Sequence, residues 1–115
     1  MATVDMALFE LLTDGDREFA QELVEMWEAK TTEDIATLRT CVQAGDSDTL
    51  LKVAHSLKGA SANLGAVAVQ GSAKELEYIG RGGDLSQAVQ VLSELVEHIE
   101  QARVVYQAYF TGASQ

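Results

Sequence analysis

Toward the end of the chain, apolar residues recur every three or four positions without a break. Side chains at that spacing lie on one face of an α-helix, which has about 3.6 residues per turn. A helix with such a long apolar face must bury it against other helices. We therefore expect a bundle helix over about residues 84–110, with an apolar face made of Leu85, Ala88, Leu92, Leu95, Ile99, Ala102, Tyr106 and Tyr109.

Similar but shorter patterns precede this segment, separated by turns that contain glycine or aspartate. Glycine is common in the left-handed position that ends a helix, and aspartate or serine accepts the free amides at a helix start. These signals predict a short helix over about residues 4–12 and longer helices over about 16–44, 46–64 and 66–80. A polar run at 30–34 interrupts the apolar positions of the second helix and indicates a polar bundle end or a locally exposed segment.

Individual residues define the expected helix ends. Gly45 and Gly65 occupy positions that should end the second and third helices. The fourth helix is expected to end at a group of glycines, Gly80, Gly82 and Gly83. Asp84 and Gln87 have the three-residue spacing of a capping box, which predicts that the last helix begins at Asp84.

The chain of 115 residues has no proline, and 47% of its residues are hydrophobic. This length fits a single domain over residues 1–115, and the absence of proline favours helices over a sheet with tight turns. Short connections make neighbouring helices antiparallel. The expected fold is all-α: an antiparallel up-down-up-down four-helix bundle, with the short N-terminal helix packed across one end.

Charge and cysteine content exclude several functions. The 8 Lys and Arg residues face 18 Asp and Glu residues, and the net charge of −10 argues against binding to nucleic acid or to anionic membranes. The chain has neither an apolar run long enough to span a membrane nor the pattern of a signal peptide. Cys41 has no partner for an internal disulfide, which suggests a buried thiol in a cytoplasmic protein.

The third helix carries an unusual polar group on its outer face. If each residue turns the helix by about 100°, His55 points roughly 165° away from the apolar face. That apolar face consists of Leu50, Val53, Ala54, Leu57, Ala60 and Leu64. Lys58 and Gly59 lie near His55, within one turn of it. The pattern predicts an exposed imidazole with a cation and an open space beside it.

This group suits phosphoryl chemistry. An imidazole with an ordinary pKa near 6.5 is mostly neutral at neutral pH, and its free ring nitrogen is a nucleophile. The Lys58 ammonium can offset the charge of a phosphoryl group, and Gly59, which costs about 1 kcal/mol of helix propensity relative to alanine, leaves room for it. A single exposed histidine is most often just solvated. The prediction therefore depends on His55, Lys58 and Gly59 together rather than on His55 alone.

Residues 55–66, HSLKGASANLGA, resemble the signature of histidine-containing phosphotransfer (HPt) domains of multistep phosphorelays. That signature is His-x-x-Lys-Gly followed six residues later by Gly. The resemblance extends to Leu76 and Glu77 in the next helix, and to the size and helix order of the whole chain. The resemblance implies a four-helix bundle that carries a phosphoryl group on a histidine.

The resemblance also implies roles for individual residues. His55 would accept the phosphoryl group through its outer ring nitrogen, Lys58 would hold the phosphoryl oxygens, and Gly59 would keep the site open. The expected partner-binding residues are Leu51, Lys52 and Ala62, which surround the histidine.

Glu77 departs from the family pattern, because several members carry a supporting glutamine at this position. A carboxylate cannot donate a hydrogen bond to a phosphoryl oxygen. We therefore expect Glu77 to contact Lys58 or to be solvated, rather than to support the site.

The implied reaction is reversible phosphoryl exchange between His55 and the aspartate of a response-regulator receiver domain. The expected partners are receiver domains, a hybrid sensor histidine kinase, or both, and the protein is expected to be a monomer. The sequence has no glycine-rich nucleotide loop and no carboxylate cluster near His55. We therefore expect no intrinsic cofactor or metal, no phosphorylation from ATP alone, and Mg²⁺ on the receiver domain.

Other classes of helical protein also present a histidine or a similar bundle. A histidine-kinase dimerisation helix is disfavoured, because Ser56 follows the histidine, proline is absent and the chain is short. The phosphotransfer domain of a chemotaxis kinase remains an alternative, as does a non-catalytic adaptor bundle. A metal-binding bundle would use Glu94 and His98, but a second ligand set is missing, which indicates that His98 is a surface residue.

Overall fold

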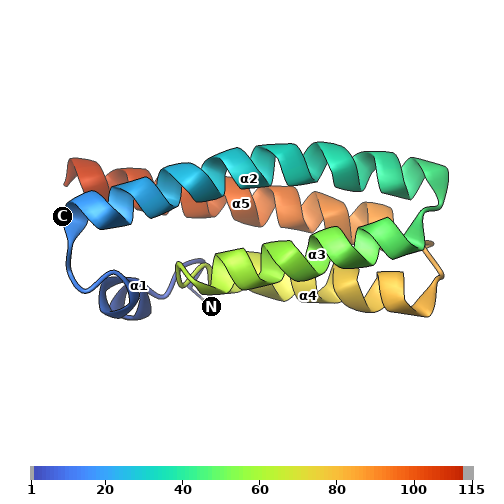
Figure 1. The fold of residues 1–115 in the computed structure, drawn as a ribbon, viewed down its shortest axis with the longest axis horizontal. Helices are drawn as coiled ribbons and strands as arrows, with labels where there is room; N and C mark the ends of the chain where they lie inside the picture. The colour runs from blue at the N-terminus through green and yellow to red at the C-terminus, as the bar shows by residue number, and fades with distance from the viewer. Residues whose placement is uncertain (1, 113–115) are drawn as a thin grey trace.

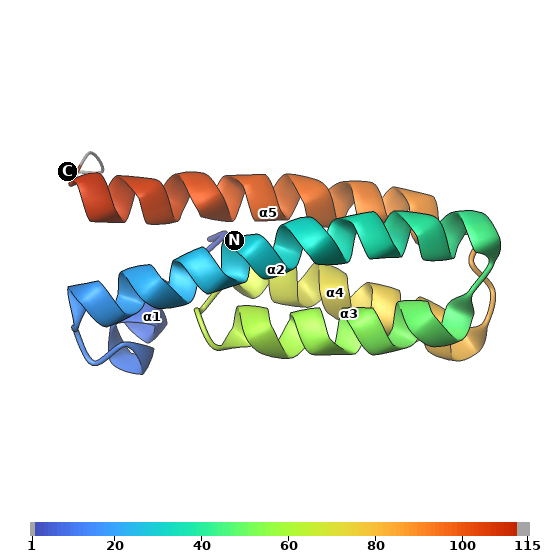
Figure 2. The same ribbon diagram turned by 45° about the horizontal axis from the view of Figure 1, so that its top comes forward.

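The computed structural model describes residues 2–112 and contains five α-helices and no strand within that range. Figures 1 and 2 show four of the helices lying alongside one another, with the short first helix at one end. The expected all-α bundle with an additional N-terminal helix is confirmed. The helices are α1 (Met6–Leu12), α2 (Arg17–Ala44), α3 (Ser47–Ala62), α4 (Val67–Gly82) and α5 (Ala88–Thr111).

The four long helices form a square bundle. Helix α2 packs against α3, α3 against α4, α4 against α5, and α5 closes the square against α2. Each helix runs antiparallel to the one before it, as the short connections predict (Figure 1). The bundle is elongated, with extents of 43 × 21 × 19 Å.

Helix α1 covers the end of the bundle where α2 and α5 extend beyond the two shorter helices (Figure 2). Its anchor is Phe9, which is fully buried. The Phe9 ring lies 5.0 Å from the ring of Tyr106 and 5.4 Å from that of Tyr109 on α5. The backbone N–H of Asp5 also donates to the carbonyl of Gly65, which ties the N-terminal segment to the α3–α4 turn.

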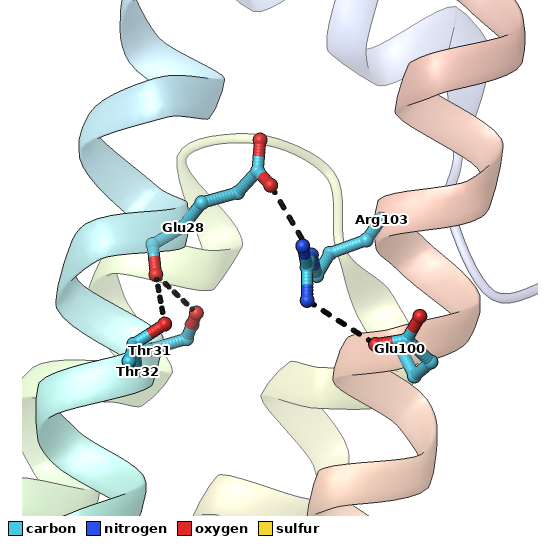
Figure 3. Close-up of polar contacts among 5 residues, drawn as sticks. All are labelled: Glu28, Thr31, Thr32, Glu100 and Arg103. Carbon is cyan, nitrogen blue, oxygen red and sulfur yellow. Dashed lines mark hydrogen bonds and ion pairs between the residues drawn. The ribbon is translucent and has the colours of Figure 1, made fainter.

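The polar run at 30–34 does not mark a bundle end, but two of its residues, Thr32 and Glu33, are exposed. Helix α2 is continuous through these residues, and Thr31 is buried. The hydroxyls of Thr31 and Thr32 both donate to the carbonyl oxygen of Glu28 (Figure 3). Because threonine can satisfy its hydroxyl on the preceding turn of its own helix, it fits a buried position that hydropathy alone does not predict.

An exposed ion pair connects α2 to α5, between Glu28 and Arg103. The guanidinium of Arg103 donates to the carboxylate of Glu28 at 3.1 Å and to that of Glu100 at 3.3 Å. Figure 3 shows Arg103 extending from α5 between the two carboxylates. Both Glu28 and Arg103 are more than a third exposed.

Several of the expected helix ends differ from the structure by two residues or more. Helix α3 ends at Ala62, two residues earlier than expected, and Gly65 then takes a left-handed conformation with φ of 67°. Helix α5 begins at Ala88 rather than Asp84, because the Asp84 carboxylate accepts the backbone N–H of Ser86 in a local turn. The capping box predicted there does not form.

Helix α4 continues two residues beyond its expected end. Gly80 and Gly82 lie inside the helix, and Gly83, with φ of 82°, ends it. Gly80 is buried against the backbone of Leu51 on α3, so its role is close packing between helices rather than helix termination. This contact lies one helical turn from His55.

Candidate functional site

The site is built on the outer face of α3. The apolar residues on the opposite face, among them Ala54 and Leu57, are fully buried in the bundle core. Burial of these neighbours fixes the rotation of the helix and directs His55 outward. The His55 side chain is 68% exposed, in agreement with its expected direction.

The inner side of the imidazole meets a carboxylate from the neighbouring helix. His55 Nδ1 lies 2.8 Å from Oε2 of Glu77 on α4. Only 7% of the Glu77 side chain is exposed. Two cations share the same carboxylate: Lys58 Nζ lies 2.6 Å from Oε1, and the Arg81 guanidinium lies 3.2 Å from Oε2.

These contacts determine the charge of Glu77. Hydrogen bonds from Lys58 first and His55 second lower the pKa of the Glu77 carboxyl to about 2, although burial acts in the opposite direction. Glu77 is therefore ionised at neutral pH and can only accept hydrogen bonds. It follows that Nδ1 of His55 carries the proton, and that a neutral ring has its lone pair on Nε2.

The space around the ring is open on its outer side. Apart from its two chain neighbours and the nearby backbone of its own helix, no heavy atom of the described residues lies within 4 Å of the position that a Cβ would take at Gly59. Lys52 is exposed, and Ala62 is half-buried. Leu51 is also half-buried, because Gly80 packs against it, so it presents less apolar surface than expected.

Comparison with known proteins identifies the family. A family model described as "Hpt domain" matches residues 22–104, which is most of the chain. The chain belongs to the Hpt domain family. The confirmed family membership makes it a histidine phosphotransfer protein of a phosphorelay.

A solved Hpt structure agrees over nearly the whole length. The chain resembles histidine-containing phosphotransfer protein B (HptB) from Pseudomonas aeruginosa PAO1, with a TM-score of 0.88 and 28% sequence identity. The similarity covers 95% of each chain. Comparison with curated protein sequences gives no match.

Sequence reasoning found this candidate site only in part. It excluded Glu77 as a donor to a phosphoryl oxygen and expected it to contact Lys58 or solvent, but it overlooked the ability of Glu77 to accept the Nδ1 proton of His55. The expected contact between Glu77 and Lys58 is present, but the carboxylate is buried rather than solvated. Arg81 was not considered, although it lies four residues after Glu77 and hence on the same face of its helix.

The second histidine of the Hpt domain lies elsewhere. His98 is half-buried rather than on the surface, and its Nδ1 lies 2.5 Å from the hydroxyl oxygen of the buried Ser72. Among the described residues, no cluster of three or more His, Cys, Asp or Glu side chains is placed to hold a metal ion. Across residues 2–112, no helix has both the length and the apolar character needed to cross a membrane.

Proposed function

We propose that the protein accepts a phosphoryl group on Nε2 of His55 and exchanges it with the aspartate of response-regulator receiver domains. The observation that carries the proposal is the contact between His55 Nδ1 and the ionised Glu77 at 2.8 Å. This contact occupies the inner nitrogen and leaves the nucleophilic lone pair on the outer nitrogen of an exposed ring.

In the proposed transfer, the bonds and charges balance without a group on this protein that accepts a proton. The Nε2 lone pair forms an N–P bond while the P–O bond to the receiver aspartate breaks, and the aspartate leaves as a carboxylate. Nδ1 keeps its proton, so the phosphorylated ring becomes positively charged. The Glu77 carboxylate, 2.8 Å from Nδ1, balances that charge, and the reverse reaction follows the same path.

Lys58 and Arg81 supply positive charge for the phosphoryl oxygens. Both bind Glu77 in the unphosphorylated protein, and both carry their charge on a flexible aliphatic chain that can turn toward Nε2. Phosphoryl transfer needs such charge stabilisation on the equatorial oxygens. Mg²⁺ bound to the receiver domain is expected to supply the remaining positive charge, and this protein is expected to need no cofactor of its own.

The surroundings of His55 suit a receiver domain. Lys52, Lys58 and Arg81 give this face a positive character in a protein whose net charge is −10. Receiver active sites are acidic, so complementary charge would speed their encounter. We place Leu51 and Ala62 at the edge of the same contact surface. A hybrid sensor kinase that carries a receiver domain would bind to this surface in the same way. We expect the protein to be a monomer and to be located in the cytoplasm.

The test is transfer of labelled phosphate from prephosphorylated receiver domains, with magnesium present, to the wild-type protein and to His55→Gln. His98→Gln is the matched control, because it removes the other histidine. We expect acid-labile label on the wild type and on the His98 variant, and none on the His55 variant. Label on His55→Gln, or no transfer from any receiver of a broad panel, would contradict the proposal.

Incubation with ATP and magnesium alone separates a phosphoryl carrier from a kinase. We expect no phosphohistidine under these conditions, because the proposed reaction takes its phosphoryl group from a receiver aspartate. The appearance of phosphohistidine on His55 from ATP alone would show that the protein supplies catalytic groups of its own.

A further inference from the structure

Gly80 lies at the closest approach of α3 and α4. A Cβ at this position would lie 2.9 Å from the backbone nitrogen of Leu51, 3.0 Å from its Cα and 3.1 Å from its Cβ. These distances are shorter than ordinary van der Waals contacts. Two of the three atoms belong to the backbone, so a rotamer change at Leu51 would not relieve the overlap.

The other helical glycines of the described chain differ from Gly80. At Gly59, Gly71 and Gly82, a Cβ would meet no described heavy atom within 4 Å apart from the two chain neighbours and the nearby backbone of its own helix. Glycine is unfavourable inside a helix, because it has more conformational freedom to lose on folding. Gly80 therefore has a packing reason that its neighbours Gly71 and Gly82 in α4 lack.

The close approach is in register with the candidate site. Leu51 precedes His55 by four residues on α3, and Gly80 follows Glu77 by three residues on α4. Because the two helices are antiparallel, both pairs lie at neighbouring levels of the same interface. The separation of α3 and α4 at Gly80 thus determines how far the Glu77 side chain, one turn away on α4, must reach to contact His55 on α3.

We propose that Gly80 is a positioning residue that holds α4 close enough to α3 for Glu77 to accept the Nδ1 proton of His55. A side chain at position 80 would force the helices apart or rotate α4. Hydrogen bonds weaken steeply as they lengthen beyond their usual range, so the contacts of 2.8 Å to His55 and 2.6 Å to Lys58 are sensitive to such a displacement.

The consequence concerns which nitrogen of His55 carries the proton. With Glu77 in place, the proton resides on Nδ1 and the lone pair on Nε2 faces solvent. When Glu77 is displaced, the ring is free to place its proton on Nε2, which removes the outer lone pair. The importance of this tautomer for catalysis rests on the function proposed above, whereas the tautomer itself is measured independently of phosphoryl transfer.

The test compares Gly80→Ala with Gly71→Ala, which adds the same methyl group to the same helix at an open position. Nitrogen-15 NMR of the His55 ring reports the tautomer, and transfer from a phosphorylated receiver reports the rate. For the wild type and Gly71→Ala we expect the Nδ1–H tautomer and equal rates. For Gly80→Ala we expect loss of that tautomer and a rate lower by about tenfold or more, since a displacement of about 1 Å can have such an effect.

An unchanged tautomer or an unchanged rate in Gly80→Ala would overturn the proposal. Circular dichroism and thermal melting establish that each variant is folded at the assay temperature. If Gly80→Ala alone is too unstable, the double variant with Gly71→Ala undergoes the same measurements, because alanine at the open position stabilises α4. If the wild type accepts no phosphoryl group, the proposed function fails, and the tautomer still tests the role of Gly80.

Discussion

Two glutamates each connect a pair of helices in this bundle, and their surroundings differ. Glu28 joins α2 to α5 through Arg103 in a contact where both side chains are more than a third exposed. Glu77 joins α4 to α3 through His55 and Lys58, with only 7% of its side chain exposed. Both contacts are ion pairs, but the residues around them give the two carboxylates different roles.

The two carboxylates differ in whether water can replace a lost partner as a source of hydrogen bonds. An exposed carboxylate that loses its partner is solvated again, and exposed pairs contribute only about 0–1 kcal/mol to stability. A carboxylate shielded from water depends on its partners for hydrogen bonds and charge. The two carboxylates therefore differ in burial and in partners: Glu77 accepts the ring proton of His55 with little exposure to water, whereas Glu28 pairs with a cation at the surface.

Replacement of Glu77 should have the largest effect among these ion-pair residues. We expect Glu77→Ala to reduce phosphoryl transfer to His55 by about 10- to 100-fold, as loss of groups that orient a reactive histidine often does. Glu77→Gln should fall between this variant and the wild type, because its amide oxygen can still accept the Nδ1 proton but carries no charge. Single-turnover transfer from a phosphorylated receiver gives these rates. Equal rates for all three proteins would contradict the positioning role of Glu77.

Lys58 comes next in expected effect. Lys58→Ala removes a cation from the phosphoryl group and from Glu77, and we expect transfer to fall by about tenfold, as loss of one stabilising charge commonly produces. Lys52→Ala is the control, because it removes an exposed cation from the same helix. The comparison uses saturating receiver, so that weaker encounter does not imitate a slower reaction. A larger loss in Lys52→Ala than in Lys58→Ala would contradict the assignment.

Much of the fold follows from local patterns in the sequence. The apolar spacing in α5 and the glycines that end α2 and α4 depend on residues close together in the chain, so the number and order of helices were predictable. The burial of Thr31 inside the polar run of α2 was not predicted, because it depends on the hydrogen bond from its hydroxyl to the backbone carbonyl of Glu28. The start of α5 was misplaced because Asp84 caps a local turn instead of the helix.

The candidate site was only partly predictable, because some of its residues are close in the sequence and others meet only through the packing of two helices. His55, Lys58 and Gly59 lie within two turns of one helix, so their spacing alone places them together. Glu77 and Arg81 belong to another helix, and their approach to His55 depends on the rotation and separation of α3 and α4. Gly80 illustrates the limit, because a glycine in a group of glycines near a helix end predicts termination unless the facing backbone of Leu51 is known.

The low pKa of Glu77 predicts a dependence of stability on pH. A carboxyl whose pKa falls to about 2 on folding, from an ordinary value near 4.5, stabilises the folded state while it is ionised. This contribution is complete above the unfolded pKa and is lost as the pH falls toward 2. Melting temperatures of the wild type and Glu77→Gln should therefore converge between pH 5 and pH 2. A constant difference over this interval would contradict the shift.

The smallest effect is expected at the exposed ion pair between α2 and α5. Arg103→Ala removes both contacts drawn in Figure 3, to Glu28 and Glu100, and should lower the free energy of unfolding by no more than about 1 kcal/mol. Urea unfolding at low and high salt measures this change, which should shrink as salt screens the wild-type pair. Phosphoryl transfer to His55 should be unchanged, because Arg103 lies on the α2–α5 side of the bundle and His55 on the α3–α4 side. A fall in transfer comparable to that of Glu77→Ala would mean that the two ion pairs are coupled through the core.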